Sequence, residues 1–142
     1  MNELVLGPVE GPLLRARLHI RGGKRRLRQG KWSAGIAALY DALSAAMEWY
    51  AAVPERRRNL VVRPGDDLNS DRDLYCILVR SGVLDGSFDF YAFDRLTDRA
   101  LGEDIDVLDP VPVVTGLESV MTLLGVLPFD EARLPKEDPK TF

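Results

Sequence analysis

The sequence predicts an all-α protein, an antiparallel helical bundle of about five helices in a single domain over residues 1–127. One observation is the segment 32–53, which has no proline, one glycine and apolar side chains that recur with the helical period. A second is that further segments repeat apolar residues at spacings of three and four between Gly and Pro turn signals. With 142 residues, 46% of them apolar, the chain can bury a core without a disulfide or a metal.

The first predicted helix begins near Pro12 and ends near Gly30. Its apolar face consists of positions three or four residues apart: Leu13, Ala16, Ile20, Gly23 and Leu27. Two adjacent glycines leave two alternatives open, because glycine weakens a helix and also lets another backbone approach closely. Either the helix breaks at Gly22-Gly23, or a neighbouring element packs tightly against it there.

The second predicted helix covers residues 32–53 and ends at Pro54. A stripe of large apolar residues follows the helical period: Trp32, Ile36, Leu39, Tyr40, Leu43, Met47 and Tyr50. Alanine fills most of the remaining surface, and only Asp41 and Glu48 are charged. Because small residues allow close packing on several sides, we expect this helix to lie at the centre of the bundle.

Residues 54–70 are expected to form a loop, since they combine three consecutive arginines with the turn signal PGDD at 64–67. A third helix is predicted to follow, with Asp71 as its cap and a stop at Ser81-Gly82. A fourth is predicted to run from a cap at Ser87 to Gly102.

Acidic residues and two prolines, Pro110 and Pro112, predict an extended connection over residues 103–114. The last helix is expected to begin at Thr115, which matches a capping box with Glu118, and to end at Gly125. Residues 128–142 are rich in proline and charge and show no periodicity. They are therefore predicted to form an extended or disordered C-terminal tail, unless a partner holds them.

Charge is divided unequally along the chain. Residues 1–58 hold 11 Lys and Arg against 5 Asp and Glu, whereas residues 59–142 hold 8 against 17. The two halves can neutralise each other within one fold or across a dimer, or the basic half can contact nucleic acid. The first ten residues carry two acids and no base, and no 18-residue stretch is free of charge. We therefore expect a cytoplasmic protein without a membrane-spanning segment.

Residue types suited to catalysis or metal binding are scarce. The chain has one histidine, His19, and one cysteine, Cys76, which excludes a multi-histidine centre and a cysteine-based zinc cluster. Acidic and amide residues alternate over 67–73 as in a calcium loop, but Arg72 and Leu78 occupy the positions of the required glycine and glutamate. We expect no catalytic residue, no metal and no cofactor.

Several arginines form a candidate phosphate-binding surface. Some lie on the first helix, opposite its apolar face, and three more follow the second helix. Clustered cationic side chains bind polyanions by releasing counterions, although the same pattern also describes a solvated helix face. The candidate phosphate-binding residues are Arg21, Arg25, Arg28, Arg56, Arg57 and Arg58.

The sequence GKWSAGIAALYDA at residues 30–42 resembles the central helix of the HEPN superfamily, and LVRSGVL at 78–84 is similar to the turn before that family's final long helix. The resemblance implies an antiparallel helical bundle that is often a homodimer. Many HEPN proteins are ribonucleases that use an arginine followed by a histidine, with four to six residues between the two. Arg99 matches the arginine, but Asp104, Ile105 and Asp106 occupy the histidine positions. The chain thus resembles the non-catalytic branch, whose members associate with themselves or with a partner such as a nucleotidyltransferase.

These observations favour a non-enzymatic interaction domain, either a homodimer or an accessory subunit of a partner protein. One alternative is an RNA- or nucleotide-binding module that uses the basic surface. Another is a degenerate ribonuclease of the HEPN type, in which turnover of RNA would depend on Arg99.

Overall fold

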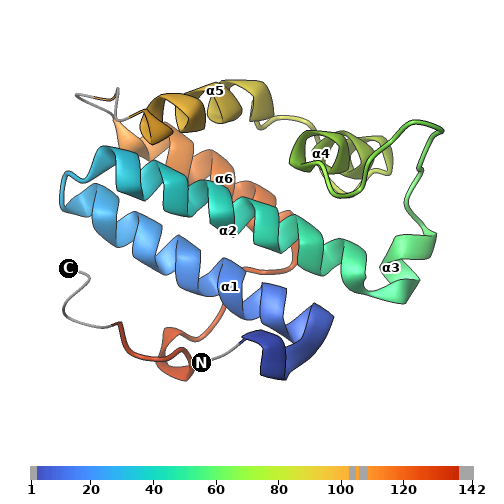
Figure 1. The fold of residues 1–142 in the computed structure, drawn as a ribbon, viewed down its shortest axis with the longest axis horizontal. Helices are drawn as coiled ribbons and strands as arrows, with labels where there is room; N and C mark the ends of the chain where they lie inside the picture. The colour runs from blue at the N-terminus through green and yellow to red at the C-terminus, as the bar shows by residue number, and fades with distance from the viewer. Residues whose placement is uncertain (1–2, 103–104, 106–108, 138–142) are drawn as a thin grey trace.

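Six α-helices and one short 3-10 helix make up the secondary structure of residues 3–102, 105 and 109–137, which the computed structural model describes. The long helices alternate in direction along the chain (Figure 1), and no strand occurs in the described residues. The predicted all-α class is confirmed. The helix bounds are Glu3–Arg28 (α1), Trp32–Ala52 (α2), Pro54–Arg58 (α3), Asp71–Arg80 (α4), Phe90–Leu101 (α5) and Pro110–Leu124 (α6).

Helices α1 and α2 form a closely packed antiparallel hairpin. Because α1 continues through Gly22 and Gly23, the helix does not break there, and the alternative of a close approach is correct. A Cβ atom on Gly23 would lie 2.8 Å from Leu39 Cδ2, and one on Gly35 would lie 2.7 Å from Leu27 Cδ2. These two glycines therefore allow the helix backbones to approach where they cross.

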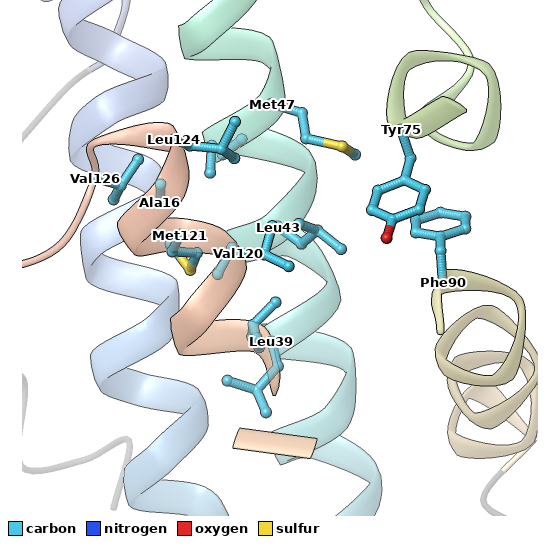
Figure 2. Close-up of a cluster of buried hydrophobic side chains, with 14 of the residues drawn as sticks. Ala16, Leu39, Leu43, Met47, Tyr75, Phe90, Val120, Met121, Leu124 and Val126 are labelled. Atoms are coloured by element: carbon cyan, nitrogen blue, oxygen red, sulfur yellow. The ribbon is translucent and has the colours of Figure 1, made fainter. Parts of the chain in front are cut away.

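The core lies between the α1–α2 hairpin and α6. Figure 2 shows Leu39 and Leu43 of α2 beside Met121 and Leu124 of α6, whereas Met47 points to the other side of α2. All five side chains are fully buried. α2 contacts each of the other five helices, which confirms that the alanine-rich helix is central.

An aromatic cluster joins α4 and α5 to α2. Tyr75 of α4 stacks on Phe90 of α5, with 5.1 Å between ring centroids (Figure 2), and Tyr40 of α2 lies 5.8 Å from the ring of Phe93. The Tyr75 hydroxyl donates a hydrogen bond to the carbonyl of Phe88 (2.6 Å). The buried tyrosine therefore keeps its polar group paired, as buried tyrosines usually do.

Helix α6 begins five residues earlier than predicted. Asp109 is its N-cap and accepts a hydrogen bond from the backbone N–H of Val111 (3.1 Å). Pro110 and Pro112 fit the first turn, because backbone N–H groups there have no partner within the helix. The predicted start at Thr115 and the extended connection over 110–114 are therefore wrong, whereas the predicted end at residue 125 is confirmed.

The caps of α4 and α5 also differ from the prediction. Ser70, rather than Asp71, caps α4 by accepting a hydrogen bond from a backbone N–H in its first turn. Asp89, rather than Ser87, caps α5 in the same way. In both cases two residues with N-cap side chains lie close together in the sequence, and local pattern alone does not separate them.

Two further boundaries were not predicted. α1 begins at residue 3 rather than near Pro12, with one non-helical residue at Gly7, whose φ is 82°. The segment 54–70 was predicted to be a loop throughout, but its first five residues form the short helix α3. Pro54 fills the first position of α3, where a proline favours helix formation.

The chain after α6 turns back and runs beside α1 (Figure 1). Val126 is fully buried, Phe129 packs against the core, and residues 131–133 form the 3-10 turn. We call residues 128–137 the C-terminal strap. Residues 138–142 of the predicted tail lie outside the described residues. The contacts between strap and α1 were not predicted, and they define the surroundings of several arginines.

Candidate functional site

The six candidate phosphate-binding arginines lie in three separate places. Two lie under the C-terminal strap, one is exposed at the end of α1, and three form most of α3: respectively Arg21 and Arg25, Arg28, and Arg56, Arg57 and Arg58. The end of α1 lies beside the start of α2, whereas α3 follows the end of α2. The 21 residues of α2 span about 30 Å, and this length separates the arginines of α3 from those near the end of α1. The structure therefore does not bring the six side chains onto one surface.

Arg21 and Arg25 hold a carboxylate of the strap between them. Arg25 Nε donates a hydrogen bond to Glu137 Oε2, and Arg21 Nε lies 3.4 Å from Oε1 of the same carboxylate. Arg21 Nη2 also donates to the carbonyl of Pro135 (2.7 Å). The side chains of Arg21 and Arg25 are only 15% and 8% exposed. We call this pair with its bound carboxylate the arginine clamp.

Arg17 extends the contact towards the start of α1. Its guanidinium donates to the carbonyl of Val126 (3.3 and 3.2 Å) and lies 5.3 Å from the centroid of the Phe129 ring. Spacings of four residues place Arg17 and the two clamp arginines on one helix face, which the sequence could predict. It could not predict the anionic partner, because Glu137 is 112 residues from Arg25.

Arg56 packs against aromatic rings of α2. Its guanidinium carbon lies 4.4 Å from the ring centroid of Trp49 and 4.8 Å from that of Tyr50. Cation–π contacts of this length attach α3 to the end of α2. Arg57 and Arg58 are exposed, so they are more accessible to an outside anion than Arg56.

A polar cluster that the sequence did not predict joins α2, α4 and α5. Burial raises the pKa of Tyr40, and so do the charges of Asp71 and Asp94 and their hydrogen bonds with its hydroxyl. Ser44 donates to Asp71 (2.8 Å), and Arg72 donates to Asp94 (3.0 Å). A tyrosine whose pKa is raised keeps its proton near neutral pH. Tyr40 therefore acts as a hydrogen-bond donor that ties the three helices together, and the cluster is structural.

An apolar groove of about 270 Å³ lies where α1 ends and α6 begins. Val111 in this groove is 65% exposed, and Leu101, in the last turn of α5, is 71% exposed. Figure 1 shows that the last turn of α5 and the first turn of α6 lie at the same end of the molecule. Clustered exposed apolar side chains are typical of contact sites for proteins. We call this surface the end groove, which is lined by Lys24, Leu27, Arg28, Pro110, Val111, Val114 and Thr115.

The described residues contain neither a metal-binding cluster nor a membrane-spanning helix. No group of three or more His, Cys, Asp or Glu side chains in this part of the chain is arranged to hold a metal ion. None of the helices there is both long enough and apolar enough to cross a bilayer.

The structure describes only some of the residues at the positions that match the catalytic motif of HEPN ribonucleases. Arg99 is exposed near the end of α5 and Ile105 is buried, whereas Asp104 and Asp106 lie outside the described residues. Comparisons of the chain with protein-family models, curated proteins and solved structures gave no match. The HEPN resemblance therefore stays a prediction.

Proposed function

We propose that this chain is an interaction domain that forms a homodimer through the end groove. The observation that carries the proposal is the exposure of Val111 and Leu101, which are the two most exposed large apolar side chains of the described residues. Full burial of one valine or leucine side chain contributes about 1.5 to 3 kcal/mol. A two-fold dimer buries both side chains from each copy, because its interface uses the same surface twice.

Charge complementarity favours a second copy of the chain as the occupant of the groove. Lys24 and Arg28 line the groove, and Arg28 is exposed. Asp98 lies one turn before Leu101, on the same side of α5, and is also exposed. In a two-fold arrangement, the acidic and apolar end of α5 from each copy meets the basic and apolar groove of the other.

The same structure makes the basic surface a weaker basis for nucleic-acid binding. Arg21 and Arg25 contact the chain's own carboxylate, and Arg56 contacts two aromatic rings. Tight binding of nucleic acid generally needs several phosphate contacts made together. The exposed candidates lie near opposite ends of α2, with Arg28 at one end and Arg57 and Arg58 at the other, so they support such contacts poorly.

Val111→Asp is expected to weaken the dimer at least about tenfold, because the interface loses an apolar side chain and must desolvate a carboxylate. An acid in the first turn of α6 favours the helix itself, so the fold should be kept. The measurement is the dissociation constant of the dimer by analytical ultracentrifugation, with circular dichroism as the check of folding.

Leu123→Asp is the matched control. Leu123 is 46% exposed and lies on α6, but 12 residues further along, about 18 Å from the groove. This variant should dimerise like the wild type. Equal dissociation constants for Val111→Asp and the wild type would show that the end groove is not the interface. A monomer that retains RNA at low salt would instead favour the nucleic-acid alternative.

A further inference from the structure

The arginine clamp has the geometry of a site for an oxyanion. Two guanidinium groups, one helical turn apart on α1, face the two oxygens of a single carboxylate. The planar N–H groups of arginine match the oxygens of carboxylates and of phosphate groups equally well. Because the clamp is largely buried, an anion bound there interacts more strongly than one on the open surface.

The carboxylate of Glu137 does not satisfy every donor of the clamp. Arg21 Nε is buried and has no hydrogen-bond partner: it lies 3.4 Å from Glu137 Oε1 without the alignment of a hydrogen bond. A carboxylate offers two oxygens in one plane, whereas a phosphate group offers three or four in a tetrahedral arrangement. A phosphate group can therefore accept from Arg25 Nε and still present an oxygen to Arg21 Nε.

We propose that the arginine clamp is a binding site for a phosphate group, either free inorganic phosphate or a phosphate monoester, and that Glu137 is its built-in competitor. Binding of phosphate displaces the Glu137 carboxylate from between Arg21 and Arg25. This inference does not depend on the proposed dimer, since the clamp lies under the strap and not in the end groove.

The strap can release Glu137 without leaving α1 altogether. Its other contacts with α1 include the carbonyl of Pro135, which accepts a hydrogen bond from Arg21, and the ring of Phe129, which lies against Arg17. The contact of Phe129 with Arg17 lies two helical turns from the contact of Glu137 with Arg25. The segment between them has only one 3-10 turn, at residues 131–133, and no α-helix. Movement of the last described residues of the strap therefore breaks the clamp contact while the buried core stays in place.

The test measures binding of inorganic phosphate by titration calorimetry at constant ionic strength. Glu137→Gln removes the competing charge and is expected to bind phosphate at least tenfold more tightly than the wild type. Adding Arg25→Gln to this variant should abolish the gain. Glu131→Gln is the matched control, because Glu131 lies on the same strap but is exposed; its affinity for phosphate should equal that of the wild type.

Phenyl phosphate, titrated in parallel, distinguishes the two sources of the phosphate group. Tighter binding of phenyl phosphate assigns a monoester, and tighter binding of inorganic phosphate assigns the free ion. Glu137→Ala is a second variant with the same expected gain, in case one replacement disturbs the strap. Equal phosphate affinities for both Glu137 variants and the wild type, or a gain that survives Arg25→Gln, would overturn the proposal.

Discussion

Ala42→Arg is expected to lower the free energy of unfolding by several kcal/mol and to lower the melting temperature strongly. Ala42 is fully buried on α2, the helix that contacts all the others. An arginine there places an unpaired cation in the core, which costs several kcal/mol. Domains of this size are stable by only about 5–15 kcal/mol, so the loss removes much of the total. Thermal unfolding followed by far-ultraviolet circular dichroism measures the effect.

The control for this prediction is Ala34→Arg, the same substitution on an exposed face of the same helix. It lies in the first turn of α2, where a cation is slightly unfavourable, so a loss of about 1 kcal/mol or less is expected. If the two variants melted at the same temperature, the buried position of Ala42 at the centre of the bundle would be refuted.

Gly35→Val is expected to lower the free energy of unfolding by about 3 kcal/mol. A Cβ atom at residue 35 would lie 2.7 Å from Leu27 Cδ2 and 3.2 Å from the backbone nitrogen of Leu27. Overpacking of this kind forces side chains or backbone to move, at a cost of about 1–3 kcal/mol or more. Urea denaturation of the variant and the wild type gives the difference directly.

Gly22→Val tests whether the cost comes from the crossing of α1 and α2 or from the new side chain itself. The nearest atom to a Cβ on Gly22 is Nη1 of Arg26 (3.0 Å), at the mobile end of a long side chain. Since valine is a better helix former than glycine, stability should change by less than about 0.5 kcal/mol or rise. A similar loss in both variants would contradict the close approach at Gly35.

The sequence predicted the helices best where composition and periodicity agreed over a long segment. α2 is the clearest case, because its many alanines predict a helix that packs against neighbours on several sides. The start of α6 was missed because two signals competed: Thr115 with Glu118 matches a capping box, whereas Asp109 with Pro110 matches an N-cap followed by proline. Both are local signals, and only the packing of residues 113 and 114 against the core favours the earlier start.

The candidate sites were less predictable than the helices. Periodicity placed Arg21 and Arg25 on one face of α1, but their partner Glu137 comes from the other end of the chain. The stacking of Arg56 on Trp49 likewise depends on the direction that α3 takes after α2. No local sequence pattern predicts this direction. Contacts between segments that are distant in the sequence decide which arginines stay accessible. Local sequence patterns do not predict these contacts.

The mass of the wild-type chain in solution tests the proposed homodimer most directly. Sedimentation equilibrium over a range of protein concentrations should show a species of about twice the chain mass of 15.8 kDa. Because exposed ion pairs contribute only about 0–1 kcal/mol each, apolar contacts should hold the dimer together in about 0.5 M salt. A single species of 15.8 kDa at every concentration, in low and in high salt, would contradict the proposal.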